Sequence, residues 1–345
     1  MTVFSKLRYF YDKKRQIINL MLDFGKIHLA KYEFTIVPDE VLELPSFKGS
    51  TLRGAFGSIF RRISCADRKY SSCKKCLLKD KCAYSYIFET SPRPDSPLLK
   101  NLEDIPRPFI IEPPLDTKRI FSKDESLQFT FTLIGKAIDY LPYFIVAFKE
   151  LGNTGIGKGR RKFILKEIRA ISIRNQDHLV IYTSQDEMIR NIDTKFTWAD
   201  TIIISRSSFR NFKAKSLTLK FLTPTRLKHR DEFVSVPEFH IIIRSLLRRI
   251  ANLTYFHCGE NLNLDFNNLI RRATKIKTEE INMHWVDWER YSFAQGRRMK
   301  MGGFTGEIKY KGELEPFIPF LILGEHVHLG KGATFGMGWY KLIIQ

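Results

Sequence analysis

Gly155-Ile-Gly-Lys-Gly159 and Gly330-Lys-Gly-Ala-Thr-Phe-Gly-Met-Gly338 are the two stretches that decide the fold of this chain. Each follows an apolar segment typical of a buried helix, and each precedes a segment typical of a strand. Nucleotide-binding loops have the reverse order, because the helix after such a loop directs its N-terminus at the phosphates. The first stretch also has Gly159 where a P-loop has a Ser or Thr. The order argues against nucleotide hydrolysis and favours a grip on a phosphate backbone, although glycines that only cap helices would give the same pattern.

The same order of elements surrounds both glycine-rich loops. Apolar residues alternate with polar ones over residues 32–36 and again over residues 217–221, which is typical of half-buried strands. A helical pattern follows each strand, over residues 52–63 and 239–250, and further strand patterns precede the helix that leads into each loop. Strand, helix, hairpin, helix and strand in succession is the ferredoxin-like order.

We therefore predict an α+β fold of two tandem ferredoxin-like, or RRM-like, domains. The first would span residues 26–210 and the second residues 211–345, after an N-terminal extension over residues 1–25. A length of 345 residues accommodates two domains, and 43% hydrophobic with 13% aromatic residues is the composition of a globular protein.

The charge of the chain indicates an anionic partner. Lys and Arg total 57 against 37 Asp and Glu, a formal net charge of +20, which favours nucleic acid or a membrane surface. No apolar run is long enough to span a membrane, and the first residues lack the continuous apolar segment of a signal peptide. The basic helices also have apolar faces that belong in a core. We expect a cytoplasmic protein that binds RNA and no membrane.

Basic residues stand beside possible stacking groups in several places, as RNA binding favours. Single clusters of this kind are often only solvated surface, but their sum is a large unbalanced charge. The candidate RNA-binding residues are Lys158, Arg160, Arg161, Arg244, Arg248, Arg290, Tyr291, Arg297, Arg298, Lys331, Gly332, Gly336 and Gly338.

Four cysteines lie close together in an insertion of the first domain, at about residues 65–90. They are Cys65, Cys73, Cys76 and Cys82. A C-x-x-C pair flanked by two further cysteines supplies four soft ligands for a tetrahedral site, and the short basic insertion has few apolar residues to form a core. We predict structural zinc, with an iron–sulfur cluster, unligated thiols or disulfides as alternatives.

Four stretches resemble a known family: Leu44–Gly57, Trp285–Ser292, Gly302–Gly306 and His328–Gly338. They are similar to the RAMP superfamily of CRISPR-associated proteins, and the last resembles the family's C-terminal glycine-rich loop closely. The cysteine cluster resembles an insertion of some members. The resemblance suggests the subgroup of endoribonucleases that cut CRISPR precursor transcripts within their repeats. It implies tandem ferredoxin-like domains, a CRISPR repeat transcript as the bound RNA, and cleavage without a catalytic metal.

Cleavage of this kind needs a base for the 2′-hydroxyl proton, an acid for the 5′-oxygen, and cations that stabilise the phosphorane. Many relatives place a histidine in or beside the first helix. This chain has no histidine between residues 29 and 177, and Arg53 stands at about that position. The catalytic candidates are therefore Lys48 and Arg53 in the first domain and His328, which directly precedes the second glycine-rich loop.

The expected function is cleavage of CRISPR repeat RNA to give a 2′,3′-cyclic phosphate and a 5′-hydroxyl. The main alternative is a non-catalytic RAMP subunit that holds guide RNA among other subunits of a CRISPR effector complex, and the missing first-helix histidine favours it. A third is a zinc-stabilised basic protein that binds nucleic acid without sequence preference.

Overall fold

The computed structural model describes residues 25–67, 72–90, 105–209, 216–260, 264–292 and 296–344. The predicted extension over residues 1–25 lies almost entirely outside these ranges. The predicted domain boundary between residues 210 and 211 also lies outside them, as does part of the cysteine-containing insertion.

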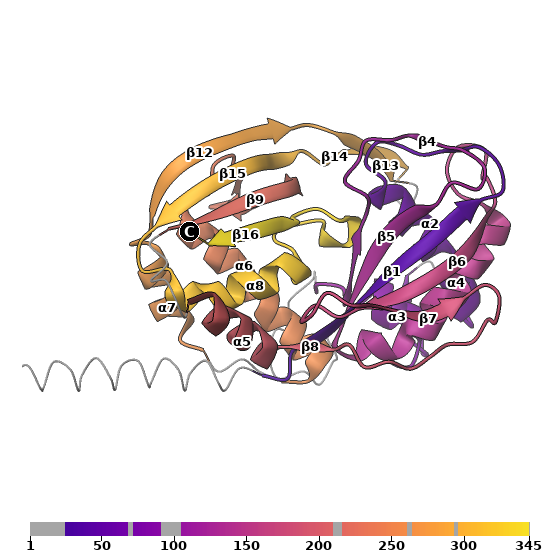
Figure 1. The fold of residues 1–345 in the computed structure, drawn as a ribbon, viewed down its shortest axis with the longest axis horizontal. Helices are drawn as coiled ribbons and strands as arrows, with labels where there is room; N and C mark the ends of the chain where they lie inside the picture. Colours follow the sequence, from indigo (N-terminus) through magenta and orange to yellow (C-terminus); the bar gives the residue numbers. More distant parts are fainter. Residues whose placement is uncertain are drawn as a thin grey trace, which may run out of the picture.

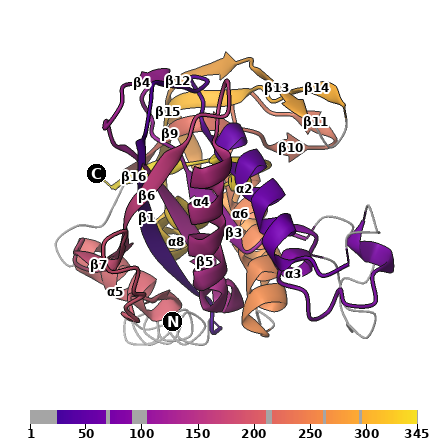
Figure 2. The same ribbon diagram turned by 90° about the vertical axis from the view of Figure 1, so that its right-hand side faces the viewer.

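The first domain is an antiparallel sheet covered on one face by two helices (Figures 1 and 2). Its strands are β1 (His28–Pro38), β3 (Phe109–Glu112), β5 (Leu127–Ile134), β6 (Phe163–Ile171) and β7 (His178–Thr183), in the order β3-β5-β1-β6-β7. The covering helices are α2 (Gly49–Ser64) and α4 (Leu141–Thr154). Without the added edge strand β7, this is the ferredoxin-like arrangement.

Aromatic packing fixes the two helices on this sheet. Phe56 of α2 has its ring centroid 4.8 Å from that of Phe144 and 5.4 Å from that of Phe148, both on α4, and 5.2 Å from that of Phe131 on β5. The alternating apolar residues of the strands face this cluster because successive side chains of a strand point to opposite faces. Pro142 stands at the start of α4, where its fixed φ favours a helix and no backbone donor is lost.

The second domain repeats the arrangement. Its strands β9 (Ser216–Thr225), β12 (Lys277–Val286), β15 (Gly303–Lys311) and β16 (Tyr340–Ile344) form a sheet in the order β12-β15-β9-β16. The apolar faces of α6 (Phe239–Leu253) and α8 (Ile318–Val327) pack in its core, and α7 (Phe266–Ala273) follows α6. The prediction of tandem ferredoxin-like domains is therefore confirmed.

Smaller elements connect or decorate the two domains. They are the strand pair β2 (Leu42–Glu43) and β4 (Ile120–Phe121), the helix α3 (Ala83–Phe88), the strand β8 (Phe196–Thr197), the helix α5 (Trp198–Phe209), and the hairpins β10 (Lys228–His229) with β11 (Glu232–Phe233) and β13 (Glu289–Ser292) with β14 (Arg297–Lys300). β8 pairs with the start of β1, and α5 packs against α8.

The domains share one apolar core at their junction. Leu29, Ile110 and Ile134 belong to the first sheet, yet they are completely buried among the residues of α6 and α8. They lie on the sheet face opposite α2 and α4. The second domain therefore buries apolar residues of the first sheet, and those residues complete the core of the second domain.

A buried histidine adds a polar contact at this junction. His257 lies in a π-helical turn, Thr254–Cys258, at the end of α6. Its Nε2 donates to the carbonyl of Pro106 over 2.7 Å, and its Nδ1 lies 3.3 Å from the Tyr86 hydroxyl in the first domain. Burial lowers the pKa of His257 from 6.5 to about 4. The ring is therefore neutral in the folded protein at pH 7 and accepts the Tyr86 proton at Nδ1.

We expect His257 to make the protein less stable in mild acid. The unfolded chain takes up this proton near pH 6.5 and the folded chain only near pH 4, so stability is complete above pH 6.5 and falls between those values by roughly 3 kcal/mol. Urea unfolding from pH 7 to pH 4 measures this decline. His257→Gln keeps a donor for Pro106 and should flatten the pH dependence; an unchanged slope would contradict the assignment.

Candidate functional site

The second glycine-rich loop is anchored on the end of β9. The Lys331 amide donates to the carbonyl of Arg226 over 3.1 Å, and the Gly338 amide donates to the carbonyl of Pro224 over 3.1 Å. The Thr223 hydroxyl donates to the carbonyl of Gly336 over 2.7 Å. The loop therefore has a fixed backbone within its own domain.

The same loop packs directly on the first domain. A Cβ added to Gly49, the first residue of α2, would lie 1.9 Å from the carbonyl oxygen of Phe335. A Cβ on Gly336 would lie 2.4 Å from Cδ of Pro113, and Gly336 has a φ of +87°, which disfavours any other residue. Both glycines are needed because two backbones from different domains touch.

Arg53 joins α2 to the loop one turn further along the helix. Its Nε donates to the Thr334 hydroxyl over 3.2 Å, and its guanidinium lies 4.6 Å from the ring centroid of Phe335 and 5.7 Å from that of Phe88. Thus the structure brings together Arg53 and the glycine-rich loop, which the sequence analysis assigned separately. Lys331 lies in the same loop and its side chain is exposed.

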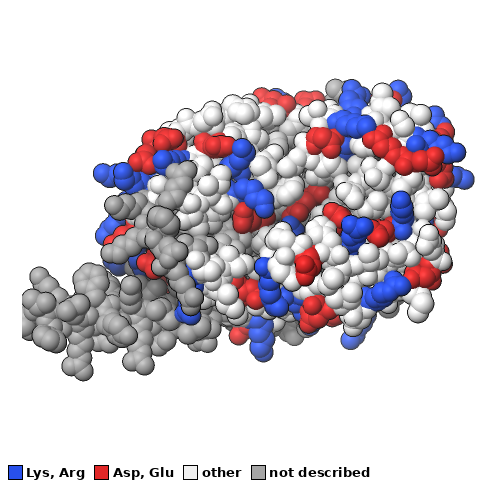
Figure 3. Space-filling view, viewed as in Figure 1, with Lys and Arg blue, Asp and Glu red and all other residues white. Residues whose placement is uncertain are grey.

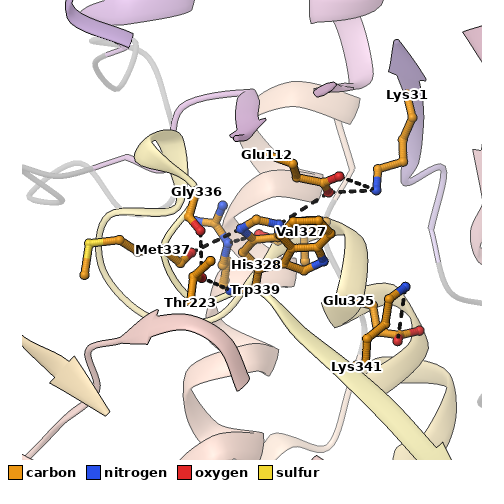
Figure 4. A network of polar contacts seen from close by, with 11 residues as sticks. Lys31, Glu112, Thr223, Glu325, Val327, His328, Gly336, Met337, Trp339 and Lys341 are labelled. Carbon is orange, nitrogen blue, oxygen red and sulfur yellow. Dashed lines mark hydrogen bonds and ion pairs between the residues drawn. The ribbon is translucent and has the colours of Figure 1, made fainter. Parts of the chain in front are cut away.

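A buried charge network lies beneath the loop (Figure 4). Nζ of Lys31 on β1 is 2.7 Å from one carboxylate oxygen of Glu112 on β3, and Nε2 of His328 lies 3.4 Å from the same oxygen. Nδ1 of His328 donates to the carbonyl of Met337 over 3.1 Å, and the ring stacks on Trp339 with centroids 5.8 Å apart. The network therefore links the first sheet to both ends of the loop.

The pKa values follow from this burial. Burial alone would raise the pKa of Glu112, but Lys31 and His328 outweigh it and lower that pKa to about 2. Burial lowers the pKa of His328 even though Glu112 opposes the change. Glu112 is thus ionised in the folded protein, and Lys31 supplies the opposite charge.

Two of the predicted catalytic side chains are completely buried. His328 is completely buried and uses its ring in the network. Lys48 is also completely buried, and its ammonium donates to the carbonyls of Ser46 and Asp116 and to the Asp116 carboxylate over 3.3, 3.0 and 3.1 Å. Each reactive nitrogen already has protein partners inside the molecule. Catalysis by Lys48 and His328 stays a prediction.

The first glycine-rich loop differs from the second. A Cβ on Gly157 would lie 2.5 Å from the carbonyl oxygen of Glu43, so the loop packs on β2 of its own domain. Lys158 pairs with Glu43 at 3.3 Å, and Arg161 pairs with Glu40 at 2.7 Å. The charges of this loop are largely neutralised locally. RNA binding by Lys158, Arg160 and Arg161 stays a prediction.

Three of the candidate RNA-binding cations of the second domain lack such partners among the described residues. Arg244 and Arg248 lie one turn apart on the exposed side of α6, and neither they nor Lys331 form an ion pair with any residue that the structure describes. Arg290, Tyr291, Arg297 and Arg298 belong to the strands β13 and β14, but their side chains lie outside the described part of the chain. On the face seen in Figure 3, by contrast, Lys and Arg are mixed with Asp and Glu.

The predicted cysteine ligands do not form a metal site in the structure. Within the described ranges, no group of three or more His, Cys, Asp and Glu side chains is arranged to hold a metal ion. Cys65 and Cys82 instead donate to the backbone carbonyls of Asp67 and Ser64. Burial raises the pKa of the Cys73 thiol to about 11, with Glu89, Cys82 and Cys65 adding to the rise.

Sequence analysis did not single out Glu112, Thr334 or Phe335. A signal for Glu112 was present, since it ends the apolar run Phe109-Ile-Ile-Glu112, and a carboxylate in a buried strand needs a partner. Thr334 and Phe335 lie between the loop glycines, where only the contact with α2 reveals their role.

Two family models match the chain. Residues 219–340 match the family described as CRISPR-associated endoribonuclease Cas6, and residues 27–194 match a family described as an N-terminal domain. No curated protein matches the chain by sequence.

Solved Cas6 structures have the same fold. A Cas6 product complex is 16% identical with a TM-score of 0.54, and the match covers 91% of this chain and 100% of that one. Cas6 from Thermus thermophilus is 14% identical with a TM-score of 0.51, over 92% and 99% of the two chains. The partial Cas6-RT-Cas1–Cas2 complex is 11% identical with a TM-score of 0.56, over 93% of this chain and 47% of that one.

Tandem ferredoxin-like domains that cover most of the chain are what it has in common with these Cas6 structures. The predicted resemblance is confirmed, and the match over residues 219–340 relates the second domain to the Cas6 endoribonuclease family. No helix among the described residues is long and apolar enough to cross a membrane.

Two glycines of the same helix test the contact between α2 and the loop. Gly49→Ala should destabilise the protein by about 1–3 kcal/mol, because the new methyl overlaps the Phe335 carbonyl. Gly54→Ala should stabilise it by about 0.5–1 kcal/mol, since nothing lies within 4 Å of the added Cβ. Chemical unfolding of both variants measures the difference, and equal effects would show that α2 and the loop do not touch.

Proposed function

We propose that the protein is an endoribonuclease that binds CRISPR repeat RNA and cleaves it without a catalytic metal. The attacking group would be the 2′-hydroxyl next to the cut, and the products a 2′,3′-cyclic phosphate and a 5′-hydroxyl. RNA is the partner, and the relatives' complexes make other CRISPR subunits possible partners. The cytoplasmic location stays a prediction.

One observation carries the proposal. The loop that ends the Cas6 match packs on the helix that begins with Gly49, and Arg53 crosses this contact to Thr334. The site therefore combines the loop of one domain with a cation of the other. A phosphate beside the loop would lie next to Arg53 and Lys331.

The residues of the chain suggest how cleavage would be assisted. An arginine fork and a lysine can neutralise the charge that develops on the phosphorane oxygens. The fixed loop can hold the RNA backbone with the 2′-oxygen in line with the leaving oxygen, which is a large source of acceleration by itself. Neither α2 nor the glycine-rich loop contains a histidine, and His328, which precedes the loop, is buried. We expect slow cleavage relative to a site that has a general base.

The same absence favours a second candidate function. A RAMP subunit that holds guide RNA without cutting it needs the basic surface and the loop but no acid–base pair. The third reading, binding without sequence preference, requires equal affinity for repeat RNA and a control RNA at the same salt concentration.

Incubation of end-labelled repeat RNA with the protein in excess EDTA tests the proposal. We expect one cut with a 2′,3′-cyclic phosphate end, and no cut when the nucleotide before it carries a 2′-deoxy sugar. Arg53→Ala should slow single-turnover cleavage by roughly 100-fold or more, and Arg53→Lys should restore only part of the rate because the fork is lost.

Arg62→Ala is the matched control. Arg62 lies further along the same helix and forms an exposed ion pair with Glu150. The Arg62→Ala variant should cleave the RNA at the wild-type rate. Tight binding with no cut by the wild-type protein would establish the guide-holding subunit. Cleavage that requires a metal ion, or an Arg53→Ala variant as fast as the wild type, would refute the mechanism.

We also propose that the insertion binds structural zinc through Cys65, Cys73, Cys76 and Cys82. All four thiols are unbridged and half-buried, and the charges of Cys65 and Cys82 act on Cys73. Leu77 and Leu78 are largely exposed, so the segment between the cysteines has little apolar core of its own. A metal held by thiolates would supply that core and would take no part in cleavage.

Elemental analysis of the purified protein should find about one zinc per chain, and Cys73→Ser should lower both the zinc content and the thermal midpoint. The position of the cut should not change. Cys258→Ser is the control, since Cys258 lies in the second domain and should leave the zinc content unaltered. Full zinc content in Cys73→Ser, or iron and sulfide in its place, would contradict the proposal.

A further inference from the structure

An exposed aromatic ring with two cations stands beside the glycine-rich loop. Phe233 on β11 is 42% exposed. The guanidinium of Arg226 lies 4.4 Å from its ring centroid, and Nζ of Lys228 lies 5.5 Å from it. Phe233 packs in neither of the apolar cores, so burial does not account for it.

The hairpin geometry places these groups on one side. Arg230 and Asp231 have φ values of +50° and +66°, the conformation of a tight two-residue hairpin turn. This turn pairs Lys228 with Phe233 and His229 with Glu232. Residues directly opposite each other in an antiparallel pair share a face, so Lys228 and Phe233 project together.

The two cations differ in their freedom to move. The Arg226 guanidinium donates to the carbonyl of Lys300 on β14 over 3.1 Å, and burial lowers its pKa. The Lys228 side chain has no hydrogen bond or ion pair with any described residue. A planar group that approaches the ring can therefore displace Lys228, while Arg226 stays in place.

Basic groups crowd the start of α6 near this hairpin. The ring of His229 lies 5.7 Å from that of His240, and burial lowers the pKa of His240. Glu238 opposes this shift, whereas His229, Arg244 and Arg230 add to it. Arg230 and Arg244 are the permanent cations among these groups, and Asp231 and Glu232 lie on the same hairpin as Arg230. A phosphate bound here would be attracted by both arginines.

The hairpin is tied to the candidate cleavage site. The carbonyl of Arg226 accepts the amide hydrogen of Lys331 over 3.1 Å, and Arg226 also binds β14 through Lys300. Figure 2 shows β10–β11 and β13–β14 extending on the same side of the molecule. The hairpin is thus the next surface that an RNA strand along the loop would meet.

We propose that the hairpin β10–β11 is a stacking site for an unpaired nucleobase of the RNA. The base lies on the ring of Phe233, Lys228 moves from the ring to a neighbouring phosphate, and Arg230 and Arg244 bind the phosphate on the α6 side. The class of ligand is single-stranded RNA, which combines stacked bases with a charged backbone. This site rests on the proposed function only in that the ligand is RNA.

Binding of repeat RNA to Phe233→Leu tests the site, because leucine keeps an apolar contact with Arg226 but has no ring. The probe is repeat RNA with a 2′-deoxy sugar at any position that the wild type cuts. We expect roughly 5- to 100-fold weaker binding and recovery in Phe233→Trp. Tyr143→Leu on α4 is the matched control, since Tyr143 is 44% exposed and lies in the first domain.

A scan with single abasic nucleotides separates stacking from a loosened loop. Loss of the base at one position should weaken binding to the wild type several-fold and have no effect on binding to Phe233→Leu, because that variant has already lost the stacking ring. We call this nucleotide the coupled position. If every position weakens both proteins equally, Phe233 only supports Arg226 and the stacking site is refuted. If the wild type cleaves repeat RNA but the scan finds no coupled position, the stacking site is refuted and the nuclease is not. If the scan finds a coupled position but the wild type does not cleave the RNA, the stacking site is confirmed and the nuclease is refuted. If the protein does not bind repeat RNA, both are refuted.

Discussion

A buried carboxylate between the two domains helps to determine where the C-terminal glycine-rich loop lies. Glu112 ends a strand whose four residues are all buried, and an ionised group in such a place is stable only with a close opposite charge. Lys31 supplies the charge from β1, which is separated from β3 by β5 in the first sheet, and Nε2 of His328 contacts the carboxylate from the second domain. The residue that begins the glycine-rich loop is therefore fixed over the first sheet, and the loop itself over the start of α2.

The two halves of the duplication have used the same loop in different ways. In the first half, the glycines let the loop fold back on β2, and nearby carboxylates neutralise its cations. In the second half, the glycines let the loop approach another domain, and the surrounding cations keep their charge available. The resulting site is asymmetric although its scaffold is a repeat.

The sequence predicts the scaffold well because the order of strands and helices follows from local periodicity. Alternation over residues 32–36 and 217–221, and the apolar face of α6, identify both domains without any long-range information. The site depends on distant contacts that periodicity does not encode. Arg53 was identified, but its partner Thr334 is 281 residues away. Lys48 and His328 have the right chemistry, yet packing buries both of them. Phe233 is one aromatic residue among many until the hairpin places two cations at its ring.

The shared core has a consequence for how far the two halves of the chain can be separated. Leu29, Ile110 and Ile134 of the first sheet complete the apolar core of the second domain. A half expressed alone would present this face to water, and a half exchanged with a relative would meet a surface of different shape. The two halves of this chain therefore depend on each other for a complete core despite their modular appearance.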